Sequence, residues 1–284
     1  MYFLLQDSFF GKSVGITMLE QDISQIVVSV PEYKEHFWEG KSSDYCLVIP
    51  VINEGGRIAS LLDKITKLNI VNLVDIIIVD GGSRDGSLSF DLLKSHNVVC
   101  LLEKQGEGRL GSQLRCAYYF ALNQGYSGVV TIDGNDKDDP SAIPLFVAKL
   151  KEGVDFIQGS RFIMGGEGLN TPKVRDWAIR YIHAPLLAYF SGFAWTDTTQ
   201  GFRGYSSKLL LDSRVSPFRE IFRSYELLAY MSYIAPKNKF KCLELPTKRS
   251  YPAGKTPTKI SFLTGNIELF KTLIYACLGK YNVK

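Results

Sequence analysis

Several acidic side chains in this sequence stand at the ends of short apolar runs, where they could bind a cation or a nucleotide. The acids that end or closely follow such a run are Glu54, Asp80 and Asp133. Carboxylate oxygens are ligands that Mg²⁺ and Mn²⁺ prefer, and these ions commonly bridge the phosphates of a substrate. A single carboxylate such as Asp80 could instead hydrogen-bond a base or a ribose. Acids after a strand often only cap the next helix, which is the better interpretation for Asp85 and Asp139.

Cationic side chains supply the second half of a possible phosphate-binding site. Arg161 ends a predicted strand and precedes the Gly165-Gly166 pair, where its guanidinium could bind a phosphate bidentately. Further cations lie in or beside the segment 246–258, namely Lys248, Arg249, Lys255 and Lys259. Carboxylates next to cations suit diphosphate chemistry, because a metal ion and cations stabilise the charge on a leaving nucleoside diphosphate. The alternative for any one of these cations is a solvated surface.

A literal G-x-G-x-x-G stands at Gly106–Gly111, after one predicted strand and before a predicted helix. With Asp133 about 20 residues further on, it resembles the dinucleotide-binding fingerprint. A nicotinamide-dependent oxidoreductase is therefore a minor alternative. The motif follows the third strand of the series rather than the first, which favours a glycine-rich loop that shapes the floor of a crevice.

Apolar strands and amphipathic helices alternate over residues 45–160. Continuous apolar runs predict strands at 46–51, 74–79, 98–102, 129–132 and 155–158. Helical spacing of apolar residues predicts helices at 58–68, 112–123 and 141–150, with a short one ending near Leu93. This order is typical of an α/β fold in which helices cover both faces of a mostly parallel sheet. Ligands of such sheets bind beyond the carboxyl ends of the strands, so the three acids are expected to line one crevice.

The segments on either side of this alternating region are less regular. Residues 1–44 lack a clear period and are interpreted as an N-terminal extension with a strand at 26–30. Residues 45–284 are interpreted as one domain, in which 45–160 form a nucleotide-binding half and 161–284 an acceptor half. The second half is expected to contain an aromatic helical stretch at 176–195, strands at 199–205 and 240–245, and a C-terminal amphipathic helix at 260–278.

Composition and charge restrict the class of protein. The chain of 284 residues has 33 Lys and Arg against 29 Asp and Glu, and a formal charge of +4 gives no argument for nucleic-acid binding. Five scattered cysteines without a C-x-x-C pair predict neither a disulfide framework nor a zinc site, which favours a reducing cytoplasm. No apolar run reaches the roughly 18–20 residues of a membrane span, and no signal peptide is recognised. We therefore expect a cytoplasmic protein whose membrane contact, if any, is peripheral.

Taken in order, the strand-end motifs resemble those of a known family. Family 2 glycosyltransferases, which have the Rossmann-like GT-A fold, carry motifs similar to Ile49–Glu54, Ile78–Asp85, Asp133–Pro140 and Gly159–Arg161. Their dolichol-phosphate mannose synthase branch is similar at Gly165-Gly166, Asp197–Phe202, Leu243–Pro246 and Arg249–Lys259. The resemblance covers roughly residues 44–262.

The resemblance implies transfer of a sugar from a nucleotide-sugar donor, typically with inversion at the sugar carbon. The implied acceptor is a polyprenyl phosphate, or else a lipid-linked or glycan hydroxyl in cell-surface polysaccharide synthesis. By position, the implied nucleotide-binding residues are Pro50, Ile52, Glu54, Asp80, Gly82, Asp133 and Gly134. The implied phosphate-binding residues are Arg161, Arg175, Arg249 and Lys259. The implied cofactor is Mg²⁺ or Mn²⁺, with Asp133 and Asn135 as ligands.

The sequence departs from the family pattern at the implied metal site. The D-x-D motif of the family reads D-G-N over Asp133–Asn135, and Lys137 stands where a glutamine ligand is expected. An amide oxygen can ligate Mg²⁺, but the ammonium of Lys137 would repel the ion. Either Asp136 or Asp138 is recruited, or Lys137 partly replaces the metal as a cation near the diphosphate. These departures keep open an alternative function, a nucleotide-sugar-binding protein that lacks transferase activity.

The acceptor decides whether a general base is needed. A sugar hydroxyl needs one to attack, whereas a phosphate is already ionised near pH 7. Glu226 is the base candidate in the C-terminal half, although it could equally be a helix residue paired to a cation. The expected catalytic residues are therefore Asp133, Arg161 and Glu226. A polyprenyl acceptor would also need a membrane-facing apolar surface, for which 177–195 and 260–278 are the candidates.

Overall fold

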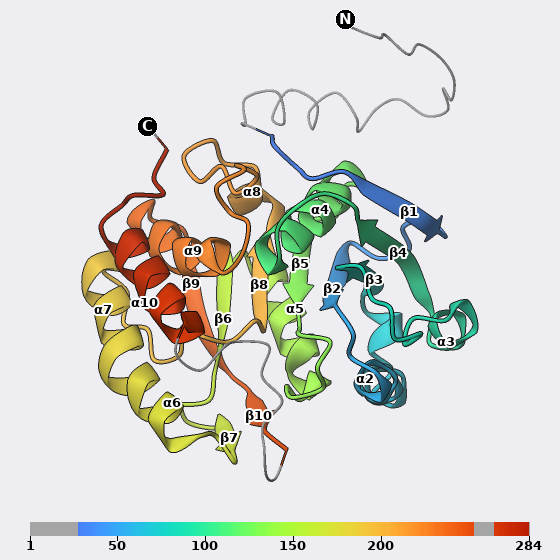
Figure 1. Ribbon diagram of the computed structural model, residues 1–284, viewed down its shortest axis with the longest axis horizontal. Coiled ribbons are helices and arrows are strands. Elements are labelled where there is room, and N and C mark those ends of the chain that lie inside the picture. The colour runs from blue at the N-terminus through green and yellow to red at the C-terminus, as the bar shows by residue number, and fades with distance from the viewer. Residues whose placement is uncertain (1–27, 253–263, 284) are drawn as a thin grey trace, which may run out of the picture.

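The computed structural model describes residues 28–252 and 264–283. They form an α/β fold around a large sheet whose strands lie in the order β1-β4-β3-β2-β5-β8-β6-β9 (Figure 1). The strands of this sheet are β1 (Tyr33–Trp38), β2 (Tyr45–Val51), β3 (Asp75–Asp80), β4 (Val98–Lys104), β5 (Gly128–Thr131), β6 (Phe156–Ser160), β8 (Arg203–Ser206) and β9 (Cys242–Pro246). A separate parallel pair is formed by β7 (Glu167–Leu169) and β10 (Lys248–Ser250).

Helices connect most of the strands. In the first half they are α2 (Gly56–Lys67), η1 (Ile70–Asn72), α3 (Phe90–Ser95), α4 (Leu110–Asn123), η2 (Pro140–Ala142) and α5 (Ile143–Lys151). In the second half they are α6 (Lys173–Ala178), η3 (Ile179–His183), α7 (Ala184–Ser191), α8 (Ser207–Leu210), α9 (Glu226–Lys237) and α10 (Thr264–Cys277). The elements α6, η3 and α7 follow one another without a break, and η3 is a π-helical turn. In the described parts of the chain, no helix has the length and apolar character needed to span a bilayer.

Both faces of the sheet are buried, which explains why its central strands are apolar throughout. Every residue of β2 and β3 is buried. Alternate side chains of β2 enter different cores. Cys46 and Val48 join the core formed with α4, α7, α9 and α10, whereas Leu47 and Ile49 join the core formed with α2 and α5. The predicted fold class, a mostly parallel sheet between helices, is confirmed.

The strand directions bring distant segments to one edge of the sheet. β4, β3, β2 and β5 are parallel, so their carboxyl ends lie together. β8 is antiparallel to β5, and Arg203 at its start pairs with Thr131 at the end of β5, so residues 197–202 enter at this same edge. β6 and β9 are parallel to each other and end there too, because β6 is also antiparallel to β8. We call this side the carboxyl edge.

The predicted elements are confirmed to within a few residues over most of the described chain, with two corrections. The strand expected at 26–30 is wrong for residues 28–30, which form no strand, while residues 26 and 27 lie outside the described part. The edge strand is instead β1, which pairs with β4 through its backbone although none of its residues is fully buried. The strand expected at 199–205 begins only at Arg203, after the carboxyl-edge segment. The C-terminal helix is described from Thr264 onward.

Candidate active site

The loops after β2 and β3 are bound to each other at the carboxyl edge. Asn53 Oδ1 accepts a hydrogen bond from the backbone N–H of Arg84 at 2.8 Å. The N–H of Gly55 donates to Asp85 Oδ2, also at 2.8 Å. The two loops that carry the predicted nucleotide-binding acids are therefore held side by side.

Glu54 and Asp80 are both largely buried, each with 8% of its surface exposed. The carboxylate of Asp80 accepts hydrogen bonds from the backbone N–H of Ser83 at 2.9 Å and from its hydroxyl at 2.6 Å. Glu54 forms an ion pair with Arg57 at 2.6 Å. The other predicted nucleotide-binding residues in these two segments are Pro50, Ile52 and Gly82. The structure thus gathers this predicted set at the carboxyl ends of two neighbouring strands and in the loops that follow them.

Gly134 joins the loop after β5 to the end of β2. Its N–H donates to Pro50 O at 3.3 Å. A Cβ atom here would lie 2.9 Å from Val51 Cγ2 and 3.0 Å from Pro50 O, so a larger residue would push the loop away from β2. This close approach places Asp133, the preceding residue, at the same edge as the other two acids.

Gln113 is a buried polar residue of this edge that sequence reasoning missed. Its Nε2 donates to Val51 O at 2.9 Å and to Val79 O at 3.0 Å, so one side chain of α4 bridges the ends of β2 and β3. The only signal in the sequence is a polar residue within an otherwise apolar helical stretch, which does not distinguish it from a solvent-facing glutamine.

Both carboxylate oxygens of Asp133 have neighbours. Arg249 Nη2 lies 3.3 Å from Oδ2, and Asn135 Nδ2 lies 3.5 Å from the same oxygen. Oδ1 faces Gly201, where a Cβ atom would overlap it. The side chain nevertheless keeps 22% of its surface exposed, so a ligand can reach it.

Arg249 lies between two carboxylates. Its Nη1 donates to Asp138, whose side chain has no exposed surface, and its Nη2 donates to Asp133. Burial raises the pKa of the Asp138 carboxyl, and the guanidinium of Arg249 opposes part of this rise. Burial alone would lower the pKa of Arg249, but the two carboxylates raise it above its usual value, so the guanidinium stays charged.

Four cationic side chains surround the ring of Tyr251, and we call them the cation cluster. Lys137, Arg249 and Arg175 lie 5.3, 5.6 and 5.9 Å from the ring centroid. Arg161 Nη1 lies 3.4 Å from the phenol oxygen. Burial would raise the pKa of Tyr251, but the three guanidinium groups together lower it below its usual value. Positive charge concentrated in this way is suited to binding phosphate.

Arg161 is held by a buried ion pair with Asp197. Its Nε and Nη2 lie 2.7 and 3.1 Å from the two carboxylate oxygens, and neither side chain exposes more than 1% of its surface. Asp197 is held in turn by Glu244, which accepts its backbone N–H at 3.0 Å. This geometry gives Arg161 a positioning role within the cation cluster, and its predicted direct contact with phosphate stays a prediction.

Glu226 begins helix α9, where its Oε2 accepts the backbone N–H of Ser224 at 2.5 Å. Its role as a general base stays a prediction. The preceding residue, Tyr225, was not predicted, yet burial and then the charge of Asp133 raise the pKa of its phenol, so it lies near the acid. A tyrosine before a helix carries no signal of function in the sequence.

The glycines of 106–111 serve the packing of protein against protein. A Cβ atom at Gly111 would lie 2.6 Å from Ser224 O, so only glycine allows α4 to approach this segment. The backbone N–H of Arg109 donates to Arg223 O at 2.7 Å rather than facing the carboxyl edge. The interpretation as a structural glycine-rich loop is therefore favoured over a dinucleotide fingerprint.

The two residues implied as metal ligands are engaged with other groups. Asn135 Oδ1 accepts the backbone N–H of Lys137 at 3.2 Å, while its Nδ2 is directed at Asp133. Asp133 itself is paired with Arg249. Among residues 28–252 and 264–283, no three His, Cys, Asp or Glu side chains are grouped so as to hold a metal. These residues do not fit the divalent ion that the resemblance implies.

The two aspartates that could be recruited are also engaged. Asp136 forms an ion pair with Lys64 of α2 at 2.7 Å and accepts the hydroxyl of Ser60 at 2.6 Å. Asp138 is bound to Arg249. The remaining predicted phosphate ligand, Lys259, lies outside the described residues.

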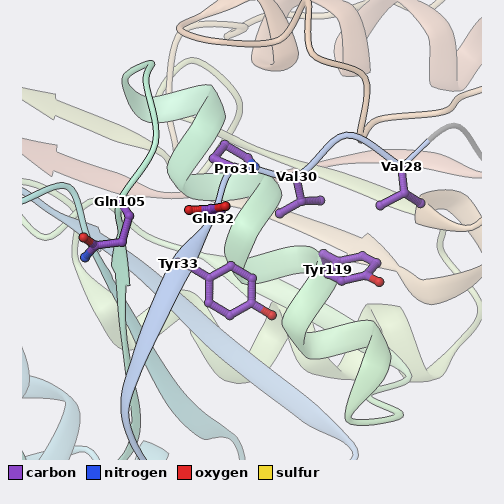
Figure 2. Close-up of a pocket in the computed structure, with 7 residues that line it drawn as sticks. All are labelled: Val28, Val30, Pro31, Glu32, Tyr33, Gln105 and Tyr119. Atoms are coloured by element: carbon purple, nitrogen blue, oxygen red, sulfur yellow. The ribbon is translucent and has the colours of Figure 1, made fainter. Parts of the chain in front are cut away.

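A surface hollow of about 530 Å³ lies beside β1 and α4 (Figure 2). It is lined by Val28, Val30, Pro31, Glu32, Tyr33, Gln105 and Tyr119. The hollow contains none of the three predicted acids and no member of the cation cluster. The candidate site is therefore assigned from its charges and hydrogen bonds rather than from concavity.

The family model of glycosyl transferase family 2 matches residues 46–213, which is more than half of the chain. The chain belongs to glycosyl transferase family 2. The match begins at β2 and ends after β8, so it contains the three acids, Arg161 and Arg175. The predicted family and the predicted glycosyltransferase activity are confirmed, and the oxidoreductase alternative is set aside.

Two curated relatives of this glycosyltransferase have names that describe the mannosylation of a polyprenyl phosphate. The polyprenol monophosphomannose synthase of Mycolicibacterium smegmatis is 24% identical over 208 residues, which cover 70% of this chain and 75% of the relative. The undecaprenyl-phosphate mannosyltransferase of Micrococcus luteus is 26% identical over 168 residues, which cover 57% of this chain and 66% of the relative.

Solved structures share the fold of this glycosyltransferase. Glucosyl-3-phosphoglycerate synthase from Mycobacterium tuberculosis, in complex with UDP, has a TM-score of 0.56 and 17% identity, over 95% of this chain and 87% of that chain. The same enzyme crystallised with Mn²⁺, UDP and its product has a TM-score of 0.53 and 16% identity, over 96% and 86% of the two chains. At this identity the likeness shows the fold alone.

Proposed function

We propose that this glycosyltransferase moves a sugar, with mannose as the first candidate, from a nucleoside-diphosphate donor to a polyprenyl phosphate. The observation that carries the proposal is the cation cluster around Tyr251, beside Asp133. Donor and acceptor each bring phosphate to the reacting carbon, so both need positive charge in one place. The names of the two curated relatives support this acceptor and this sugar.

The donor nucleoside is assigned to the loops after β2 and β3. Its ligands in this proposal are Pro50, Ile52, Glu54, Asp80, Gly82 and Gly134. The buried carboxylates of Glu54 and Asp80 are held by Arg57 and Ser83, which supports a pre-formed set of nucleoside ligands. Asp133 stands where the donor diphosphate would meet the cation cluster. The proposed division into a nucleotide-binding half at 45–160 and an acceptor half at 161–284 follows this assignment.

The acceptor is assigned to the surface beside Arg175. Helix α6, which carries Arg175, also carries Val174 and Trp177, whose exposed fractions are 72% and 55%. Leu169, 45% exposed, accepts the backbone N–H of Tyr251 at 3.0 Å, so apolar surface adjoins the cation cluster. Figure 1 shows α6 beside β7, which carries Leu169. A phosphate attached to an apolar chain has the same layout, which supports a peripheral position on the cytoplasmic face of a membrane.

The transfer itself needs no protein base if the acceptor is a phosphate. An acceptor phosphate oxygen, already ionised near pH 7, attacks the sugar carbon from the side opposite the diphosphate. The new C–O bond forms as the C–O bond to the diphosphate breaks, and the electron pair leaves with the nucleoside diphosphate. This displacement inverts the sugar carbon and needs no proton transfer by Glu226. In this proposal the cation cluster stabilises the leaving group.

The proposal is tested with a donor panel of UDP-, GDP-, CDP- and dTDP-sugars, including the mannose forms, and undecaprenyl phosphate as acceptor. We expect one donor to give the lipid-phosphate sugar, detected by mass spectrometry together with released nucleoside diphosphate. Asp133→Ala should lower turnover by about a hundredfold or more. Asp91→Ala, at an exposed aspartate of α3, is the control and should leave turnover unchanged.

The panel also separates the competing possibilities. Donor binding without transfer or hydrolysis would favour a nucleotide-sugar-binding protein, the alternative suggested by Asn135 and Lys137. Transfer to a glycan hydroxyl but not to undecaprenyl phosphate would refute the proposed acceptor while leaving the glycosyltransferase assignment intact.

A further inference from the structure

We infer that this transferase neutralises the donor diphosphate with Lys137 and Arg249 in place of a divalent metal ion, so that donor binding needs no metal. The inference rests on the proposed function, because it concerns the diphosphate of the same donor. It deepens that function by assigning the charge compensation to side chains of this chain. Solved structures of the same fold contain Mn²⁺ with UDP, so the inference is specific to the residues present here.

The carboxylate expected to bind the metal already has a cationic partner. Arg249 reaches Asp133 at 3.3 Å with one nitrogen and binds the fully buried Asp138 with the other. A guanidinium between two carboxylates stands where a bridging metal ion would have to go. Displacing the Arg249 guanidinium would cost substantial free energy, because Asp138 would then be a buried charge without a counter-ion. Arg249 is thus a permanent part of the site.

The second expected ligand does not offer its oxygen to an ion. Asn135 Oδ1 accepts the N–H of Lys137 at 3.2 Å, and the amide nitrogen is the group directed at Asp133. A metal ion coordinated by Asp133 would therefore meet the donor end of this amide. It would also be repelled by the ammonium of Lys137, which interacts electrostatically with Asp133.

Lys137 is carried by a loop that is anchored on both sides. Its carbonyl accepts the backbone N–H of Ser250 in β10 at 2.7 Å. The preceding residue, Asp136, forms an ion pair with Lys64 of α2 at 2.7 Å. The ammonium lies 5.3 Å from the centroid of the Tyr251 ring, an arrangement that favours a cation over the ring face. The charge is therefore held at the carboxyl edge before any substrate binds.

The charges in the site favour stabilisation of the diphosphate by cationic side chains rather than by a divalent metal ion. When the C–O bond to the donor breaks, the electron pair stays on the diphosphate oxygen, which gains one negative charge. With both carboxylates ionised, Arg249, Asp133 and Asp138 together carry one negative charge. Lys137 and Arg175 beside them add two positive charges, so the group as a whole is positive. Cations fixed in advance stabilise a leaving group without reorganising during the reaction.

The test is calorimetric titration of the full chain with UDP, GDP, CDP and dTDP, in EDTA and again in Mn²⁺. We expect one nucleoside diphosphate to bind in EDTA, with an affinity that changes less than about threefold in Mn²⁺. Lys137→Gln should weaken binding in EDTA by about tenfold or more, because a charge at the diphosphate is lost. Lys151→Gln is the matched control, since Lys151 also lies over a tyrosine ring, that of Tyr45, at the start of β2.

A double variant restores the acidic character expected of a metal site at positions 135 and 137. Asn135→Asp with Lys137→Gln adds a carboxylate and removes the ammonium, so we expect its nucleotide binding to become dependent on Mn²⁺. Thermal unfolding of each variant shows that it is folded.

Each outcome decides between the two proposals. Nucleotide binding by the wild type only in Mn²⁺, or unchanged affinity of Lys137→Gln in EDTA, would overturn the metal-free inference and leave the proposed function standing. No nucleotide binding in either buffer would overturn both.

Discussion

Among single residues, Gly201 sets the position of the Asp133 carboxylate. A Cβ atom at Gly201 would overlap Asp133 Oδ1, so Gly201→Ala must shift the carboxylate or the backbone that faces it. We predict that kcat falls by about tenfold or more, with the unfolding temperature lowered by only a few degrees because overpacking costs about 1–3 kcal/mol. Steady-state kinetics on the donor panel measure this. Gly56→Ala, where a side chain meets open space, is the control. A wild-type kcat for Gly201→Ala would show that the carboxylate position is unimportant.

The sequence revealed the acids of the site but not their partners. Asp80 and Asp133 could be predicted because Asp80 ends the buried strand β3 and Asp133 follows the buried strand β5 by two residues. Strand ends of a parallel sheet meet at one edge. The ion pairs of Arg161 with Asp197 and of Arg249 with Asp138 join residues 36 and 111 positions apart. Their pairing depends on how β6, β8 and β10 are arranged, and no local pattern encodes it. An arginine that is predicted from the sequence to bind phosphate can therefore be paired with a buried acid in the structure.

At the scale of elements, the π-helical turn η3 carries the next prediction, a pH dependence of stability. Burial, with the nearby charge of Arg175, lowers the pKa of His183 to about 4, and Asp197 opposes this only in part. The unfolded chain has its histidine pKa near 6.5. Between these values the unfolded state takes up a proton that the folded state does not, so stability falls as pH falls from about 6.5 to 4.

The loss of unfolding free energy over this range should reach up to about 3 kcal/mol. Urea unfolding of the wild type and of His183→Gln between pH 7 and pH 4.5 measures it, and the difference between the two curves isolates this histidine from the carboxylates. Parallel curves for the two proteins would show that His183 takes up its proton at the same pH in the folded and the unfolded state, against this prediction.

Elements with strong local patterns were predictable, and elements that depend on distant pairing were not. β2 and β3 are buried on both faces, so their sequences are apolar throughout and read as strands. β1 has no buried residue and is held by pairing with β4. β7 and β10 are three-residue strands whose paired residues are 81 positions apart in the chain, as in the pair of Glu167 with Lys248. The segment 199–202 resembles a strand in composition but enters the carboxyl edge as a loop before Arg203.

At the scale of the whole molecule, the exposed apolar face of α6 and η3 distinguishes a lipid acceptor from a water-soluble one. Val174, Trp177 and Tyr181 recur at helical spacing and are 72%, 55% and 66% exposed. We predict that Trp177→Gln lowers transfer to undecaprenyl phosphate in phosphatidylcholine vesicles by about tenfold, because less apolar surface enters the interface. Transfer to a water-soluble short-chain prenyl phosphate should change less than about twofold.

The matched control is Phe90→Gln, at a 57% exposed aromatic of α3, far from α6 in Figure 1. Vesicle co-sedimentation gives an independent readout of interface binding. Equal losses with both acceptors would mean that Trp177 acts on the site rather than on a membrane.

A crystal structure of the protein with its nucleoside diphosphate would locate the donor directly. We predict that the base and ribose lie beside Glu54 and Asp80, and that the diphosphate lies within hydrogen-bond distance of Lys137 or Arg249. Density for the nucleotide elsewhere, such as at the glycine-rich loop 106–111 or in the hollow beside β1, would contradict it.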